Sequence, residues 1–329
     1  MKILKKYMVI GIIISFVGAS FLPTVTSNDI ENKQSPLNSS IIWYVDANAD
    51  CPGDGTKQSP FCRIEYALNI ASASDTIRVF SGKYYENNLN VDISIKIIGN
   101  GSDNTIIDGG FSGTNIININ SDGVELSGFG FINCGYNAVC VKRCIGGTIK
   151  NNAFYDVIVG INLDNSENII ISENDIDEFQ WYGIWIYQSN SNDVLYNNIT
   201  STTGDLELFR NQQGSGILLW GSDRTTIKFN NIYKCNYGIY FHSSGFNDVE
   251  ENDIQKNEVG FFVLMSFLNT VTKNNICSNA MMDLVAVFTF DWYPNNWWGN
   301  KLYGPVGRAF RILAGAVSIF PWSQQEHDL

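Results

Sequence analysis

The chain has 329 residues, of which 44% are apolar and only 16% are charged, and its formal net charge is −12. This length suits one large solenoid domain as well as two ordinary domains. The acidic balance argues against nucleic acid as a partner and disfavours anionic membrane surfaces, because their phosphate groups would be repelled.

Residues 1–27 predict an export signal. Lys2, Lys5 and Lys6 form a basic start, and the apolar run that follows carries no charge. An uncleaved membrane anchor is the alternative, because the run nearly reaches spanning length. A polar linker is expected over residues 28–41. We therefore expect a secreted or cell-surface protein outside the cytoplasm.

The chain has seven cysteines. Cys51 and Cys62 flank a loop rich in Gly and Pro, and they are the best candidates for a disulfide in an oxidising compartment. Two of the residues Cys134, Cys140 and Cys144 are candidates for a second pair. The full pairing, which also involves Cys235 and Cys277, stays open at this stage.

A short motif recurs through the middle of the chain: a β-branched residue, two further residues, Asn, one residue, and then Ile or Phe. The Asn steps are 22, 23, 33, 22 and 22 residues, and the positions are Asn152, Asn174, Asn197, Asn230, Asn252 and Asn274. Asn296 lies 22 residues further on. A column with the same steps consists of Gly160, Gly183, Gly216, Gly238 and Gly260. Two columns with one period indicate stacked coils.

Within each repeat the apolar residues alternate with a period of two, as in Ile184 and Ile186, which is typical of β-strands. The ladder of leucine-rich repeats and the periodicity of helical repeats are absent. We therefore expect an all-β fold, a single-stranded right-handed parallel β-helix over residues 42–322 with coils of about 22 residues. The Asn side chains should stack along its axis as a hydrogen-bonded ladder.

Both ends of this solenoid are expected to be capped, because open coils would expose the core and unpaired strand edges. In the N-terminal cap, residues 42–80, residues 63–72 predict a short helix with Ile64, Leu68 and Ala71 on one face. The C-terminal cap, residues 297–322, abandons the repeat, and a polar tail follows over residues 323–329. Its candidate plug residues are Trp297, Trp298, Phe310, Ile312, Phe320 and Trp322.

Several short motifs outside the repeat carry a family resemblance. They are Trp43–Asp46, Gly53–Gly55, Ser59–Phe61, Gly82–Tyr85, Thr105–Gly109 and Asn295–Asn300. Together with the repeat they resemble the pectin-lyase-like superfamily and, more narrowly, the NosD-type β-helix proteins, labelled periplasmic copper-binding, and their archaeal surface relatives. The resemblance implies the fold over residues 42–322. It implies little about activity, because this fold supports many functions.

Alternation places Ile161, Ile184, Ile217, Ile239 and Phe261 in the core, so the residues between them should point outward. A contiguous aromatic strip on a solvated sheet usually marks a contact surface. The predicted ligand-binding residues are Trp185, Tyr187, Trp220, Tyr240, His242 and Phe262. Sugar rings are the expected occupants, and cover by a loop or by a second protein are the alternatives.

The 33-residue step locates one insertion, expected as a loop over residues 200–215 that leaves the coil register unchanged. It contains Asp205, Glu207 and Arg210, and it precedes the coil of Trp220. Loops on a rigid scaffold often carry function. A solvated loop without function is the alternative.

A glycosidase needs two carboxylates about 5–9 Å apart. The weak candidates are Asp164, Asp205 and Glu207, with Arg210 as a basic group, but no spacing enforces a pair. The patterns that are typical of polygalacturonases, pectate lyases and mannuronan epimerases are absent. The catalytic residues are therefore unknown, and a polysaccharide lyase or glycoside hydrolase is an alternative to binding alone.

Copper and calcium are minor alternatives as cofactors. Copper prefers Cys, Met and imidazole ligands, but the only histidines are His242 and His327. Met265, Met281 and Met282 fall in neighbouring turns, although Met is also a common core residue. Calcium would need outward carboxylates, and the repeat supplies no row of them. The sequence predicts no metal site.

The leading hypothesis is an exported β-helix protein that binds polysaccharide or another surface polymer on its aromatic strip. The second is the lyase or hydrolase. The third is an accessory protein of the NosD kind that assists a metalloenzyme outside the membrane. The sequence leaves the polymer and the oligomeric state open.

Overall fold

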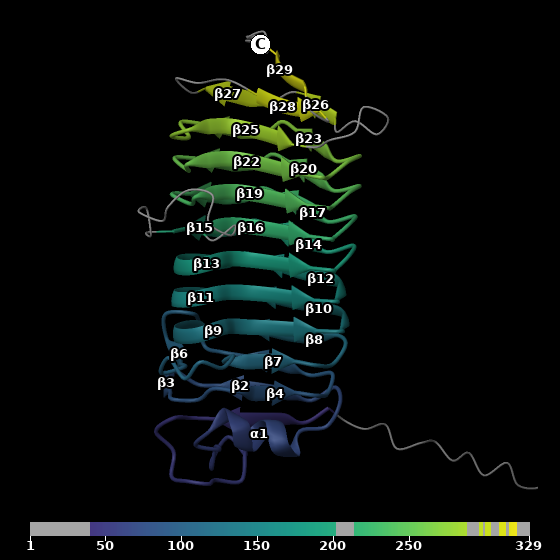
Figure 1. Ribbon diagram of the computed structural model, residues 1–329. Helices are drawn as coiled ribbons and strands as arrows, with labels where there is room; N and C mark the ends of the chain where they lie inside the picture. The colour runs from purple at the N-terminus through teal and green to yellow at the C-terminus, as the bar shows by residue number, and fades with distance from the viewer. Residues whose placement is uncertain are drawn as a thin grey trace, which may run out of the picture. The chain divides into compact units, whose positions relative to one another are not determined.

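The described part of the chain belongs to one unit, Ser40–Leu329, which Figure 1 shows as a computed structural model. The structure describes residues 40–201, 214–287, 296–298, 300–303, 309–313 and 316–320, and beyond residue 295 it describes backbone and the side chain of Asn300. The predicted export signal and most of the linker lie outside these residues. Among the described helices, none is long and apolar enough to cross a membrane.

The unit is a parallel β-solenoid of about nine turns with coils of about 23 residues, which confirms the predicted fold class. Sheet A has 11 strands, stacked in coil order in Figure 1. They are β1 (Ile42–Val45), β2 (Thr76–Val79), β5 (Lys96–Ile98), β8 (Val124–Ser127), β10 (Ile145–Lys150), β12 (Glu167–Ser172), β14 (Asp193–Leu195), β17 (Thr226–Lys228), β20 (Asp248–Glu250), β23 (Thr270–Thr272) and β26 (Asn296–Trp298).

Sheet B contains the other strands. They are β3 (Gly82–Tyr84), β4 (Leu89–Val91), β6 (Thr105–Asp108), β7 (Ile117–Ile119), β9 (Gly130–Lys142), β11 (Ala153–Asp164), β13 (Asp175–Tyr187), β15 (Asn198–Thr200), β16 (Ser215–Trp220), β18 (Asn231–Tyr233), β19 (Tyr237–His242), β21 (Asp253–Gln255), β22 (Val259–Leu264), β24 (Asn275–Cys277), β25 (Met282–Val287), β27 (Lys301–Tyr303), β28 (Ala309–Leu313) and β29 (Ala316–Phe320). The long strand β13 pairs with both β15 and β16, so one long strand in the early coils corresponds to two short strands later. The antiparallel pair β28–β29 comes last.

The Asn column forms the predicted ladder. Asn197 Nδ2 donates to Asn230 Oδ1 at 2.9 Å, and Asn230 Nδ2 donates to Asn252 Oδ1 at 2.9 Å. Asn230 Nδ2 also reaches the carbonyl oxygen of Val194, so each amide ties a turn to its neighbours. The ladder consists of Asn152, Asn174, Asn197, Asn230, Asn252, Asn274 and Asn300. Its last member is Asn300 because the final turn is longer, and Asn296 instead pairs with Thr270.

A second polar row, which the sequence analysis missed, lies at another turn. The backbone N–H of each member donates to the hydroxyl of the next, at 2.9–3.1 Å. The members are Ser166, Ser189, Ser222, Ser244 and Ser266. Their steps of 23, 33, 22 and 22 residues equal those of the Asn column, so the signal was present in the sequence. The buried backbone N–H groups of this turn are thus hydrogen-bonded to serine hydroxyls of the next coil.

The Gly column marks positions where neighbouring coils approach too closely for a side chain. A Cβ added at Gly238 would lie 2.5 Å from the carbonyl oxygen of Gly260 and 2.5 Å from Ile254 Cγ2. At Gly216 the corresponding carbonyl oxygen, that of Gly238, would lie at 2.7 Å. Only glycine fits where one backbone packs against another at this distance.

The insertion leaves the coil register unchanged, as predicted. Residues on either side keep their partners: Ile199 pairs with Ile232 and Ile217 with Ile239. The predicted bounds were too wide, because Thr200 and Ser215 belong to strands. Residues 202–213, with Asp205, Glu207 and Arg210, lie outside the described residues.

Replacing residues 202–213 with a single Gly should leave the solenoid folded. In the next coil, residues 234–236 alone join Tyr233 and Tyr237, the partners of Thr200 and Ser215, so Ser201, one Gly and Gly214 suffice to close the shortened coil. We expect soluble protein with an unchanged β-type circular dichroism spectrum and a Tm within about 3 °C of wild type, because long surface loops cost little. Aggregation of the shortened chain would contradict this reading of the insertion.

The N-terminal region contains the predicted disulfide and the predicted short helix. Cys51 and Cys62 are bonded, with their Cα atoms 5.2 Å apart. Helix α1 (Ile64–Ile70) buries Ile64 and Ala67, while Leu68 and Ala71 are partly buried against the core. The buried carboxylate of Glu86 accepts hydrogen bonds from the first backbone N–H groups of the helix, at 2.8 and 3.0 Å.

The suggestion that two of the residues Cys134, Cys140 and Cys144 form a second disulfide was wrong. All three are free and buried. Cys134 and Cys144 point into the solenoid core, whereas Cys140 points to the outer face of sheet B and thus away from the other two. Burial raises the pKa of the Cys140 thiol to about 11. The proposed plug residues of the C-terminal cap have side chains outside the described residues.

Candidate functional site

Two rows of side chains on the outer face of sheet B contain the predicted site residues, one from each coil. The first outward row includes Asn162, Trp185, Leu218, Tyr240 and Phe262. The second outward row includes Asp164, Tyr187, Trp220, His242 and Leu264. Both rows have the register that the repeat predicts, and the alternating residues Ile184, Ile217 and Ile239 are fully buried in the core.

The strands of sheet B bend toward the outside at the Gly column. The rings of Tyr182 and Trp185 lie 5.3 Å apart, and those of Tyr237 and Tyr240 lie 5.2 Å apart. Residues three apart in a straight strand point to opposite faces and do not touch. The intervening glycine, Gly183 in the first case, therefore folds the strand so that both flanks face one outer hydrophobic cluster. Its buried members are Val159, Tyr182, Leu218, Tyr237, Tyr240, Val259 and Val285.

This bend corrects the expectation of a fully exposed strip. Tyr240 is 5% exposed and Leu218 is 0% exposed, and both belong to the outer hydrophobic cluster, in which the rings of Tyr237 and Phe262 pack against Tyr240. Trp185 and Phe262 are half-buried at the margin of the same cluster. The sequence analysis missed Tyr182 and Tyr237, because strict alternation places them on the opposite face of the strand from Trp185 and Tyr240.

The second outward row stays accessible and forms a chain of ring contacts. Trp220 is 37% exposed. Its ring lies 4.6 Å from the imidazole of His242 and 6.3 Å, edge to face, from Tyr187. The Tyr187 ring in turn lies 5.8 Å from that of Trp185. Four of the six predicted binding residues thus form one continuous surface.

Unpartnered polar atoms accumulate on this surface. Six buried side-chain polar atoms lack a hydrogen-bond partner within the described part of the chain, and three of them belong to the outward rows: Asn162 Oδ1, Trp185 Nε1 and His242 Nδ1. Burial lowers the pKa of His242 below its ordinary value, so its imidazole is neutral at pH 7. Buried polar groups are normally bonded, so exceptions gathered on one face require an explanation.

Of the three candidate carboxylates, the structure describes Asp164. Asp164 pairs with Lys142 at 3.6 Å and accepts a hydrogen bond from Asn165. Asp205 and Glu207 lie outside the described residues. Asp164 is thus the sole member of the predicted acidic set whose surroundings are known, and a neighbouring cation neutralises it.

The described side chains do not fit a metal site. Within the ranges that the structure covers, no group of three or more His, Cys, Asp or Glu is placed to hold a metal ion. Burial raises the pKa values of Cys134, Cys140 and Cys144, so these residues are thiols and not the thiolates that bind copper. Met281 and Met282 pack against the outer hydrophobic cluster. The described His, Cys, Asp and Glu side chains therefore supply no clustered donor set for copper or calcium.

Solved structures share the fold at low sequence identity. The complex of XylC with xylose has a TM-score of 0.66 and 12% identity, covering 85% of this chain and 73% of that chain. DFA-IIIase from Arthrobacter chlorophenolicus A6 has a TM-score of 0.58 and 13% identity, covering 79% and 76%. Alginate lyase from Paenibacillus sp. str. FPU-7 has a TM-score of 0.52 and 13% identity, covering 80% and 98%. At such identities the likeness shows the fold alone.

Among curated proteins, none matches this sequence. A family model described as periplasmic copper-binding protein (NosD) matches residues 68–302, which include most of the solenoid. The word periplasmic agrees with the expected location outside the cytoplasm, while the copper-binding function finds no ligand set in the described residues. The repeat, the polar ladders and this match together show that the chain belongs to the NosD family.

Proposed function

We propose that this protein binds a polysaccharide outside the cytoplasm, with the second outward row as the centre of the binding surface. The observation that carries the proposal is the concentration of unpartnered polar atoms along both outward rows, at Asn162 and Trp185 in the first row and at His242 beside Trp220 in the second. Sugars present both an apolar C–H face and hydroxyl groups, so a surface of this mixed kind suits them.

The rings of this surface are already held in place. Trp220 is fixed between Tyr187 and His242, so binding a sugar costs little further side-chain entropy. A neutral imidazole at His242 can exchange hydrogen bonds with hydroxyl groups without the cost of burying a charge. The surface therefore favours a polymer of hydroxylated units over a charged partner such as nucleic acid.

The similar structures are consistent with this proposal at the level of fold. One is a complex with xylose and another is an alginate lyase. The lyase or hydrolase alternative would require a second carboxylate within about 5–9 Å of Asp164, and that carboxyl is already paired with Lys142. Binding without cleavage is therefore the function that the described geometry supports best. The predicted export signal and the Cys51–Cys62 disulfide favour a secreted or surface-attached form.

Replacing Trp220 with Ala should weaken polysaccharide binding. Removal of a central aromatic anchor costs about 1–2 kcal/mol, which corresponds to roughly a five- to thirtyfold increase in Kd. A panel of neutral and acidic polysaccharides screened by affinity electrophoresis, with product release measured in parallel, identifies the ligand and separates binding from cleavage. Trp185→Phe, which removes the indole N–H and part of the ring but keeps an aromatic side chain, should give a smaller loss.

Phe229 provides the matched control for this experiment. It is 38% exposed, like Trp220 at 37%, but it lies at the turn between β17 and β18, where its ring stacks on Tyr196 at 4.8 Å. Phe229→Ala should leave polysaccharide binding unchanged. Equal affinities for Trp220→Ala and wild type, with the fold intact, would show that the second outward row is a packing surface.

A further inference from the structure

The first outward row continues beyond the aromatic coils toward the N-terminal end of the solenoid. Asn162 pairs with Cys140, Cys140 with Asn118, and Asn118 with Asn90 on β4. Five coil steps separate Asn90 from Leu218, which corresponds to a length of about 24 Å. One face of sheet B thus connects helix α1 with the coil of Trp220, and it changes from aromatic to amide-rich along the way.

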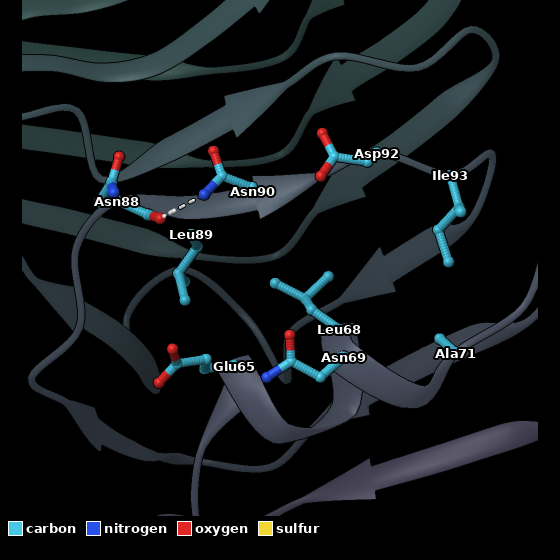
Figure 2. A pocket seen from close by; sticks show the side chains of 9 residues that line it. All are labelled: Glu65, Leu68, Asn69, Ala71, Asn88, Leu89, Asn90, Asp92 and Ile93. Atoms are coloured by element: carbon cyan, nitrogen blue, oxygen red, sulfur yellow. Dashed lines mark hydrogen bonds between the residues drawn. The ribbon is translucent and has the colours of Figure 1, made fainter.

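A pocket of about 380 Å³ lies at the end of this face, between α1 and β4 (Figure 2). Figure 2 shows Glu65 and Asn69 on the helix side and Asn88, Asn90 and Asp92 on the strand side. Its apolar lining consists of Leu68, Ala71, Leu89 and Ile93. This volume falls within the range of small-molecule sites in proteins.

The amides beside the pocket are fixed in orientation although they are exposed. Asn118 Nδ2 donates to Asn88 Oδ1 at 3.0 Å and to Asn90 Oδ1 at 3.2 Å, while Asn90 Nδ2 donates to the carbonyl oxygen of Asn88 at 3.1 Å. Asn115 Nδ2 in turn donates a hydrogen bond to Asn118 Oδ1 at 2.7 Å. Such a network presents donors and acceptors in a set arrangement, which reduces the entropy lost on binding.

Two side chains of the pocket have hydrogen-bonding groups that no described residue satisfies. Asp92 Oδ1 accepts from Asn120 Nδ2 at 2.9 Å, and its second oxygen has no partner in the described residues. The Asn69 side chain likewise makes no hydrogen bond there. Hydroxyl groups could donate to Asp92 and bond with Asn69 and Asn90, while the apolar lining accepts C–H groups. This combination suits a sugar ring.

The charges of the pocket select against acidic sugars. Two of its nine lining residues are carboxylates, Glu65 and Asp92, and none is Lys or Arg. Glu65 is paired with Arg63 at 3.3 Å, whereas Asp92 has no ion pair in the described residues. A uronate or sulfate group would be repelled by the Asp92 carboxylate, for which the described residues supply no cation partner.

We propose that the pocket between α1 and β4 is a subsite for the end of a saccharide chain, and that it takes a neutral sugar. The inference rests on the proposed function, because the subsite lies on the same face as the aromatic surface and one extended chain can reach both. It adds a specificity to that function: the terminal unit of the ligand carries no acid group.

The test uses short saccharides that can occupy the pocket alone. Full-length protein is titrated with cellobiose, xylobiose and lactose, and separately with digalacturonate, and binding is followed by NMR chemical-shift changes. At least one neutral disaccharide should bind, and digalacturonate should not. Asn69→Arg, which introduces a long cation on an exposed helix face, should raise the Kd of the neutral sugar at least tenfold. Asn231→Arg, a matched change on β18, should have no effect.

The outcomes separate this inference from the proposed function. Trp220→Ala should retain disaccharide binding while weakening polysaccharide binding, whereas Asn69→Arg should weaken both. If no neutral disaccharide binds, or if Asn69→Arg binds it like wild type, the subsite is refuted even when polysaccharide binding is normal. If polysaccharide binding is insensitive to Trp220→Ala, the proposed function fails. Tighter binding of digalacturonate than of neutral sugars would refute the charge selection.

Discussion

Asn230→Leu should lower the free energy of unfolding by about 3–5 kcal/mol. Asn230 Oδ1 accepts two hydrogen bonds from Asn197, and its Nδ2 donates to Asn252 and to the carbonyl oxygens of Val194 and Lys228. Leu removes all of them and leaves buried donors and acceptors without partners, at about 1–3 kcal/mol for each group that water cannot reach. Thermal unfolding followed by circular dichroism should show a Tm lower by roughly 5–10 °C.

Asn231→Leu is the control, because it makes the same chemical change at the neighbouring position. Asn231 is exposed, and its side chain makes no hydrogen bond in the described residues. The Tm of the Asn231→Leu variant should stay within about 2 °C of wild type, as is usual for surface substitutions. Equal effects of the two substitutions would mean that the ladder adds nothing beyond the packing of the turn.

Gly238→Ala should destabilise the protein by about 3 kcal/mol, a large effect for one methyl group. The new Cβ would lie 2.5 Å from the Gly260 carbonyl oxygen and 3.1 Å from Asn257 Nδ2, so two coils must move apart. Overpacking against backbone is poorly relieved by side-chain rotation. Urea unfolding should show a lower midpoint with a similar slope.

Gly146 offers a contrasting position. It has φ of +71°, and a Cβ there would meet nothing within 4 Å. Asn tolerates this left-handed conformation, so Gly146→Asn should change stability by less than about 1 kcal/mol. A neutral Gly238→Ala would show that the coils are less tightly packed than their backbone contacts indicate.

The solenoid could be predicted from the sequence because its physics repeats. Every coil must satisfy the same turn and fill the same core, so Asn197 and Ile217 recur with one period and reveal the stack. The Ser row was equally periodic but was missed, since Ser is common in this chain. The sequence analysis did not assign Asn300 to the ladder, because its coil is longer and its separation of 26 residues from Asn274 breaks the period.

The site was less predictable because it depends on what does not repeat. The two-residue alternation placed Tyr240 outside correctly, but it could not show that a bend at Gly238 brings Tyr237 over it. The pocket lies in the early coils, where Asn90 and Asn118 are 28 residues apart and no repeat is visible. Its two sides come from helix α1 and strand β4, and the sequence pattern does not indicate that these two elements lie side by side.

The Asn ladder also gives the solenoid an electrical direction. In each amide the oxygen accepts from the preceding coil and the nitrogen donates to the following one, as in Asn174, Asn197 and Asn230. The side-chain dipoles therefore add head to tail, and each polarises the next. Every coil offers a donor face on one side and an acceptor face on the other. A duplicated coil would therefore extend the ladder without leaving a mismatched layer of amides.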